Sequence, residues 1–252
     1  MGFAVDEKGE KMSKSRGNVI DPVPILEKYG ADAFRFWAAS ETSLGSDFRC
    51  SEKRVEEASK FLTKLWNVTR FISAFPIPKE KPKLTATDEW ILSEVNKLLD
   101  ECMKGYDDFN FFIPANKVRE FVWNLFAPHY IEMVKKRAYG EGFTKSEQLA
   151  AWYTLHQVLK SILLLLAPIV PFMTDFVWKR LYGKKSIHLQ PFPKKFKVND
   201  FTYLTEKLIE FNSQVWKEKK EKNLSLKDPI SVEIPKELEP FTKDLVAMHN
   251  IT

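Results

Sequence analysis

The sequence predicts a mainly α-helical fold, a helical bundle preceded by a loop-and-helix segment and followed by a small α/β appendage. Apolar residues recur three and four positions apart over several long stretches, which is the spacing of amphipathic helices. Short segments rich in proline, glycine or charge separate these stretches. Near the C-terminus the spacing changes to alternation over 230–234, which is typical of a strand. We therefore expect three regions, 1–50, 51–197 and 198–252.

Composition limits the class of protein. The 252 residues are 44% hydrophobic, enough for one large core or two modest ones, and the net charge of +5 favours an anionic partner. Cys50 and Cys102 form no Cys-x-x-Cys pattern and the four histidines lack metal spacing, so we expect reduced thiols, a core role for His156 and no metal site. The N-terminus is charged, and the longest apolar run, 162–173, holds two prolines. These features predict a cytoplasmic protein without a membrane partner.

A short basic loop near the N-terminus carries the clearest chemical pattern. It combines two ammonium groups with two hydroxyls and a thioether: Lys11, Met12, Ser13, Lys14 and Ser15. Glycines on either side, Gly9 and Gly17, predict a mobile segment. Lysines supply point charges for phosphate oxygens, and serines add short hydrogen-bond donors. We expect this loop to close on a polyanion.

Helical spacing accounts for the chain that follows the loop. A first helix is expected over 24–40 behind a cap at Asp21, and a loop over 42–50. Ser51 is then expected to start a long helix over 52–74. The buried stripe predicted for this helix has six members: Val55, Ala58, Leu62, Leu65, Thr69 and Ile72.

Further helices are marked by their start and stop residues. One begins near Asp88, and another begins at Ala115 and should be kinked or broken at Pro128, which lacks an amide donor. A capping box over 144–147 opens a central helix that ends at Leu166. Two more helices, over 202–221 and 238–248, flank the expected strand.

The polar side of the helix over 52–74 is a candidate RNA-binding surface. Five residues collect there: Lys53, Lys60, Lys64, Asn67 and Phe71. An aromatic ring among lysines and an amide offers unstacked bases a platform, phosphate-neutralising charge and a base-edge partner. The alternative is that Phe71 only extends the apolar arc towards Phe75.

Three groups of residues resemble class I aminoacyl-tRNA synthetases. The basic loop, the Arg-Gly-Asn after it and the run Tyr29–Arg35 are similar to the signature loop of that class. The runs Trp123–Tyr139 and Ala167–Met173 resemble the helical anticodon-binding domain of its valyl, isoleucyl and leucyl subgroup. Within the subgroup, Leu44–Arg49 looks like the valyl branch, of archaeal type; the isoleucyl branch is the alternative.

The resemblance implies an activity and its ligands. In that family the loop holds the triphosphate of ATP, which arrives with Mg²⁺, so Lys11 and Lys14 would be catalytic and all five loop residues would bind ATP. The region 1–50 would contact the tRNA stem. The region 51–197 would bind the anticodon, with a stacking aromatic in the run Asn67–Phe71. The full enzyme would adenylate valine and transfer it to tRNA(Val).

One departure from the family pattern limits the expected activity. The second ATP-binding sequence of the class, His-x-Gly-His, does not occur in this chain. We therefore expect a C-terminal fragment of a larger, monomeric enzyme that binds tRNA but neither holds ATP nor activates valine alone. A free-standing RNA-binding module is the non-enzymatic alternative.

Overall fold

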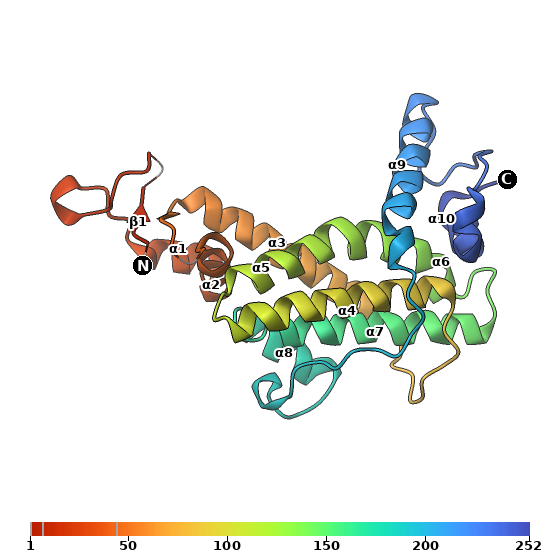
Figure 1. The fold of residues 1–252 in the computed structure, drawn as a ribbon, viewed down its shortest axis with the longest axis horizontal. Helices are drawn as coiled ribbons and strands as arrows, with labels where there is room; N and C mark the ends of the chain where they lie inside the picture. The colour runs from red at the N-terminus through yellow and green to blue at the C-terminus, as the bar shows by residue number, and fades with distance from the viewer. Residues whose placement is uncertain (1, 7, 44) are drawn as a thin grey trace. The chain divides into compact units, whose positions relative to one another are not determined.

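The computed structural model describes residues 2–6, 8–43 and 45–252, and these are mainly helical, as predicted (Figure 1). Leu44, part of the segment expected to separate the valyl and isoleucyl branches, lies outside the described residues. The chain divides into two compact units. The first comprises Met1–Phe71, Leu98–Phe121 and Lys160–Lys194, and the second comprises Ile72–Lys97, Val122–Leu159 and Lys195–Thr252.

The first unit begins with a two-stranded sheet that the sequence did not reveal. β1 (Ala4–Val5) pairs in parallel with β2 (Phe48–Arg49), inside the segment expected to be only a loop. Strands of two residues are too short to show alternation, so no periodicity could predict them. Gly2 lies so close to the segment before β2 that an added Cβ would stand 1.7 Å from the Ser46 carbonyl oxygen.

The prediction of a single helix over 24–40 is wrong, because the structure has two helices there. α1 (Pro22–Tyr29) and α2 (Ala31–Glu41) are separated at Gly30, whose φ of 81° and ψ of 162° leave the helical region. That conformation is open essentially only to glycine. The cap at Asp21 is confirmed, since its Oδ1 accepts from the Val23 amide at 3.0 Å.

Several other helices of the first unit pack on α2. α3 (Glu52–Ser73) has nearly the expected bounds, α5 (Phe112–Glu120) and α8 (Pro171–Leu181) both pack on α2, and α8 is followed by the short turn η3 (Ile187–Leu189). Polar contacts add to this packing. The Arg35 guanidinium donates to the carbonyls of Pro168 and Ile169, and Asp32 accepts from the Met173 amide at 2.7 Å.

The second unit contains the start of α4 (Ala86–Asp107), most of α7 (Lys145–Leu166) and the helix α6 (Glu132–Tyr139). The capping box before α7 is confirmed: Glu147 accepts from the Thr144 amide at 2.8 Å and also binds the Lys243 ammonium. α7 is one described helix that is long and apolar enough to cross a membrane, but 67% of its most apolar stretch is buried inside the fold.

Pro128 does not break its helix, one of the two outcomes expected for it. It lies in a π-helix, η2 (Phe121–Ile131), which continues directly into α6. A proline removes one amide and clashes with the carbonyl four residues back in an α-helix. The i→i+5 pattern moves that carbonyl out of the way, so the segment widens instead. Val122, Phe126 and Tyr130 remain fully buried along it.

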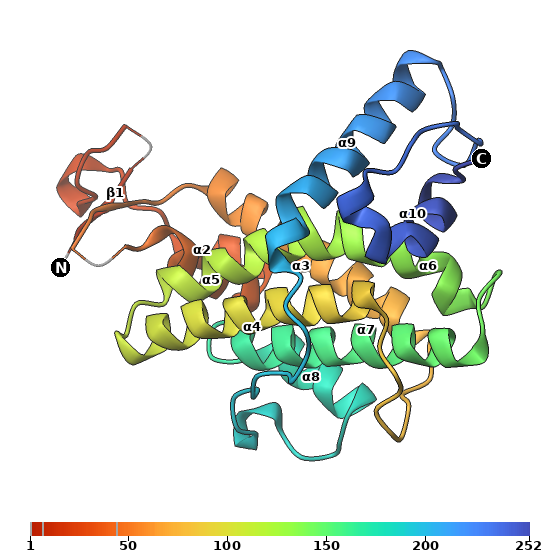
Figure 2. The same ribbon diagram turned by 45° about the vertical axis from the view of Figure 1, so that its right-hand side comes forward.

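The C-terminal part of the second unit is helical rather than α/β. α9 (Thr205–Glu221) follows the turn η4 (Thr202–Leu204), and α10 (Thr242–His249) follows η5 (Lys236–Phe241). Both views place α9 and α10 side by side, with α10 packed on α6 (Figure 2). The strand expected over 230–234 is reduced to one bridge between Ile230 and Ile251, because the prolines on either side stop the pairing.

A buried charge cluster joins three helices of this unit. The fully buried Arg137 guanidinium on α6 donates to both carboxylate oxygens of Asp88, at 2.7 and 2.9 Å, and to the Thr85 hydroxyl. Its Nε lies 3.1 Å from Asp244 Oδ1 on α10, an ion pair that is not aligned as a hydrogen bond. The Tyr130 hydroxyl also donates to Asp88, at 2.8 Å.

Candidate nucleic-acid interface

The basic loop is fastened to the small sheet by its backbone. Val5 and Lys11 form an antiparallel bridge, and the Met12 amide donates to the Ala4 carbonyl at 3.2 Å. A 3₁₀ turn, η1 (Lys14–Arg16), follows and closes at Gly17, whose φ of 69° is left-handed. The residues predicted to bind phosphate therefore lie partly in the pairing with the sheet and partly in the turn that follows it.

Asn18 organises this turn, and sequence reasoning missed it. Its side-chain oxygen accepts from the Ser13 amide at 2.9 Å, and its amide group donates to Asp6 Oδ2 at 2.9 Å. The Asn18 hydrogen bond, followed by that from the Glu10 amide, lowers the pKa of Asp6 and keeps it ionised. The only signal in the sequence was the amide itself, placed between Gly17 and an apolar residue.

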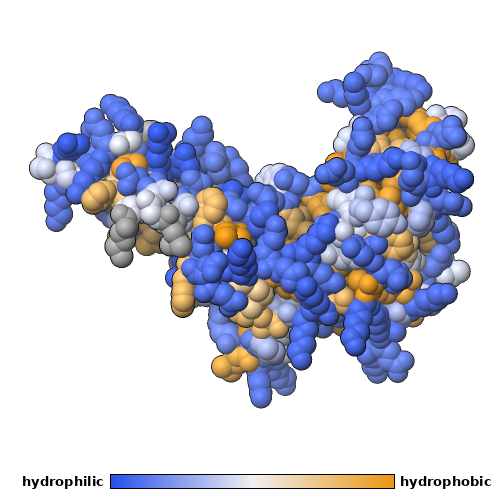
Figure 3. Space-filling view, viewed as in Figure 1, coloured by the Kyte–Doolittle hydropathy of each residue, from blue (hydrophilic) through white to orange (hydrophobic). Residues whose placement is uncertain are grey.

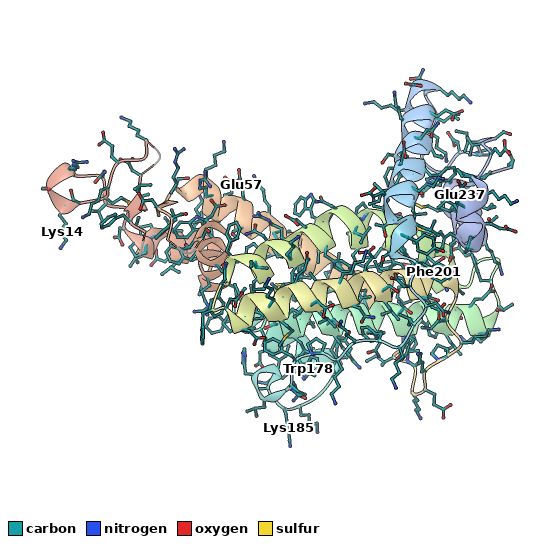
Figure 4. The ribbon with its side chains drawn as sticks, viewed as in Figure 1. Lys14, Glu57, Trp178, Lys185, Phe201 and Glu237 are labelled. Carbon is teal, nitrogen blue, oxygen red and sulfur yellow. The ribbon has the colours of Figure 1, made fainter. Side chains whose placement is uncertain are left out.

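The loop presents its charged groups to solvent. Lys14 is exposed and lies at the tip of the loop, pointing away from the rest of the unit (Figure 4). The Lys11 ammonium, also exposed, lies 4.1 Å from the centre of the Phe3 ring, and the hydroxyls of Ser13 and Ser15 are 3.2 Å apart. Two ammonium groups beside two hydroxyls are donors suited to phosphate oxygens. Among the described residues, no group of His, Cys, Asp and Glu is arranged to hold a metal ion.

The predicted surface on α3 remains accessible. Lys53, Lys60 and Asn67 are exposed, and Lys64 and Phe71 are partly exposed. The opposite side is buried as expected, with one change: Phe61 and Val68 belong to the core, whereas Leu62 is only partly buried. The broad stripe follows from the packing of Phe61 on Phe36, with ring centres 4.6 Å apart.

The lysines of this surface are not equivalent. Lys60 forms an ion pair with Glu56 at 2.8 Å, and that hydrogen bond raises the Lys60 pKa. Lys53 has no ion-pair partner among the described residues. The charge of Lys53 is therefore more available to an incoming phosphate than that of Lys60.

Two exposed aromatic side chains next to this surface were not predicted. Trp66, on α3 beside Asn67, is 40% exposed, and its ring centre lies 6.0 Å from that of Phe176 on α8, which is 53% exposed. Trp66 stands at the edge of the apolar stripe, a position that helical spacing alone assigns to neither side. Trp66 and Phe176 therefore add two accessible rings to the partly exposed ring of Phe71.

The core role expected for His156 is confirmed, and two other histidines are also buried. His156 is buried, with Nε2 3.0 Å from the Phe75 carbonyl oxygen, and His129 and His249 are buried and bind Asn212. Burial lowers the pKa of both His129 and His249 to about 4, so they are neutral near pH 7. Both cysteines are buried free thiols.

Comparison with known families matches two regions of the chain. Residues 88–234 match the family described as the anticodon-binding domain of tRNA ligase, and residues 1–51 match tRNA synthetases class I (I, L, M and V). The predicted resemblance is confirmed in both parts. The 1–51 match contains the basic loop, and the 88–234 match contains the helices from α4 to α9.

Individual relatives agree over almost the whole chain. The chain is 42% identical to the valine–tRNA ligase of Aeropyrum pernix over 98% of its length and 43% identical to that of Pyrobaculum aerophilum over 100%. These alignments span 31% and 32% of those ligases, about a third of each. The fold is also that of a segment of the LeuRS–tRNA–LeuAMS complex of Agrobacterium radiobacter K84, with a TM-score of 0.58 and 19% identity, covering 82% of this chain and 24% of that one.

Proposed function

Because the chain belongs to the family of anticodon-binding domains of tRNA ligases, we propose that it is the tRNA-recognising part of a valine–tRNA ligase. Its similarity to valine–tRNA ligases over nearly its full length supports valine rather than isoleucine as the amino acid. Acting in the cytoplasm and as a monomer, it binds tRNA(Val), while the complete enzyme joins valine to that tRNA at the expense of ATP.

The observation that carries the proposal is the accessible surface on α3. Its buried side holds the core of the first unit together, so the opposite side is free to carry a binding function. Lys53 supplies a charge without an acidic partner among the described residues, Asn67 an amide, and Phe71 a partly exposed ring. Unpaired anticodon bases are recognised by stacking on aromatic rings and by hydrogen bonds to their edges.

Replacing Phe71 tests this surface. Stacking contributes roughly 1–3 kcal/mol per base, so Phe71→Ala should weaken binding of the chain to tRNA(Val) about tenfold. Tyr203→Ala is the matched control, since Tyr203 is 74% exposed but lies in the other unit. Filter binding with tRNA(Val) and with isoleucine tRNA gives the affinities, and thermal melting checks the fold.

Two results would contradict the proposal. If Phe71→Ala binds tRNA(Val) as tightly as the unaltered chain, or unfolds the protein, Phe71 is a packing residue. If the unaltered chain binds isoleucine tRNA more tightly than tRNA(Val), the alternative isoleucyl assignment holds instead.

The basic loop is proposed to serve the complete enzyme in adenylation. ATP supplies the phosphates, and the ammonium groups of Lys11 and Lys14 would neutralise charge on them as pyrophosphate leaves. Asn18 hydrogen-bonds to the Lys11 carbonyl and to the Ser13 amide, so the backbone that carries both lysines is ordered before the nucleotide arrives. In the full-length ligase, Lys14→Ala should slow adenylation more than it weakens ATP binding. An unchanged adenylation rate with reduced ATP affinity would mean that Lys14 only binds the ground state.

We propose that this chain by itself does not activate valine. The two lysines can only neutralise phosphates that other groups have positioned, and the sequence lacks the His-x-Gly-His element of the class. Exchange of labelled pyrophosphate into ATP is the direct assay. Valine-dependent exchange by the purified chain would refute the statement.

A further inference from the structure

A pocket of about 640 Å³ lies within the second unit, whereas the surface on α3 assigned above belongs to the first. Its walls come from α6, α9, α10 and the loop that follows α9. Hydrophobic residues reach the surface in the region of α9 and α10, among hydrophilic ones (Figure 3). This volume is in the range of sites that hold small ligands.

Two aromatic side chains line the pocket. The Trp216 indole packs against His129, with ring centres 5.3 Å apart, and near His249, at 6.1 Å, while the rest of it faces the pocket. Tyr139 is 56% exposed and its ring meets Phe75 edge-on at 5.3 Å. His129 and His249, both buried and neutral, pack beside the indole and hold its position; His249 also lines the pocket.

Charged residues line the pocket, and the ammonium groups among them differ in availability: Glu132, Lys135, Lys136, Glu141 and Lys227. Lys135 is bound to Glu132 at 2.9 Å, and Lys136 donates to the side-chain oxygen of Asn250. Lys227 is exposed and has no acidic partner among the described residues. Lys227 is therefore the group best able to meet an anionic ligand.

The loop that carries Lys227 is held rigidly although it lacks regular secondary structure. The buried Lys219 ammonium donates to the carbonyls of Leu226 at 2.8 Å, Asp228 at 2.7 Å and His249 at 2.7 Å. The first two carbonyls flank Lys227 directly. The Asn250 amide also donates to the Lys227 carbonyl, at 2.7 Å. The buried Lys219 ammonium thus holds in place the loop that carries the exposed Lys227.

We propose that this pocket binds a single nucleotide, with the base against Trp216 and the phosphate on Lys227. A flat aromatic wall beside an unpaired cation suits a ligand that is both planar and anionic, and a nucleotide is both. The inference rests on the proposed function, because an unstacked nucleotide of the bound RNA is one source of this chemistry. A free nucleotide is the other source, and the experiment separates them.

The test uses the full chain with two probes, 5′-AMP and a single-stranded tetranucleotide of uridine. Each should quench tryptophan fluorescence, and because the chain has seven tryptophans, the Trp216→Phe variant identifies the share from Trp216. Lys227→Glu should weaken binding about tenfold, since it exchanges an attraction for a repulsion. Lys83→Glu is the matched control: Lys83 is exposed, in the same unit and not in the pocket wall.

Each outcome decides the question. Quenching by 5′-AMP supports a free-nucleotide site, and quenching by the tetranucleotide alone supports a site for an RNA strand. If neither probe quenches Trp216, or if Lys227→Glu binds as tightly as Lys83→Glu, the inference is overturned. Binding of tRNA(Val) that still responds to Phe71→Ala would then leave the proposed function intact, whereas loss of all tRNA binding would refute that function.

Discussion

Arg137→Met should be among the most damaging single substitutions in the second unit. Methionine nearly fills the volume of the arginine side chain but removes its charge and its hydrogen-bond donors. Asp88 would lose two hydrogen bonds from the guanidinium, and Asp244 would lose the cation 3.1 Å away. Two buried carboxylates would then face each other without a counter-charge.

The magnitude follows from these losses. Removing one partner of a buried ion pair costs roughly 3–5 kcal/mol, so we expect a loss of about 4 kcal/mol near pH 8. That is a large part of the roughly 5–15 kcal/mol that stabilises a typical domain. Asp244→Asn should cost only about 1 kcal/mol, because Arg137 keeps its bidentate partner Asp88.

The loss should depend on pH with a defined sign. Burial raises the pKa of Asp244 to about 6, from 3.8 for an unfolded aspartate, so the native state binds the proton more tightly. Protonated Asp244 therefore stabilises the folded state relative to the unfolded state. This contribution to the free energy of unfolding is fully present below about pH 3.8 and is lost as the pH rises through about 6. Without Arg137 the ionised form of Asp244 loses its main stabilising charge, so the pKa of Asp244 rises further. Each unit of that rise adds about 1.4 kcal/mol to the loss of unfolding free energy at high pH.

Urea denaturation followed by far-ultraviolet circular dichroism, at pH 5 and pH 8, measures the effect. Arg137→Met should destabilise more at pH 8 than at pH 5. Arg180→Met, at an exposed position on α8, is the control and should stay within about 0.5 kcal/mol of the unaltered protein. A loss for Arg137→Met below 1 kcal/mol, or one that does not change with pH, would refute this account of the cluster.

Three further predictions can be tested separately. Lys53→Ala should reduce the salt dependence of tRNA binding by about 0.7 in slope, and Lys60→Ala by less, because its ammonium is already paired; equal slopes would contradict this. The Lys243 hydrogen bond lowers the pKa of Glu147 to about 2, so Glu147→Gln should cost about 1 kcal/mol at pH 7 and almost nothing at pH 2, measured by urea unfolding; a pH-independent cost would disprove it. Gly105→Ala should destabilise by about 1–3 kcal/mol although alanine favours helices, because its Cβ would lie 2.8 Å from Pro114 Cδ; a raised melting temperature would show that the site can relax.

Helices could be predicted from this sequence where one buried face repeats over several turns. α3 and α7 have nearly the predicted bounds, and α4 begins near the predicted residue, because their apolar spacing is long and regular. The break at Gly30 and the π-helix around Pro128 were missed, since each depends on backbone torsions that spacing does not report. The prediction of a strand over 230–234 was wrong because alternating apolar residues do not show whether a second strand is available for pairing. Only Ile230 is paired, in a bridge with Ile251.

The candidate sites divide in the same way. Lys11, Lys14 and the surface on α3 could be named from the sequence because their residues are contiguous or follow one helical period. The role of Asn18 could not be predicted, since its hydrogen bond to Asp6 joins residues that are twelve positions apart in the sequence. The pocket around Trp216 and Lys227 joins α6, α9 and α10, and no local pattern relates three separate segments.

The continuous helix formed by the π-helix around Pro128 and α6 limits where residues can be inserted into or deleted from this chain. Tyr130 and Arg137 reach the same carboxylate from one continuous helix, so the number of residues between them is fixed by two hydrogen bonds to Asp88. One inserted residue there would turn Arg137 by about 100° and point its guanidinium away from Asp88. The linker over 75–85 lies outside every helix and can absorb the same insertion. Length variation among natural or designed versions of this chain should therefore collect in the linker and be absent between Tyr130 and Arg137.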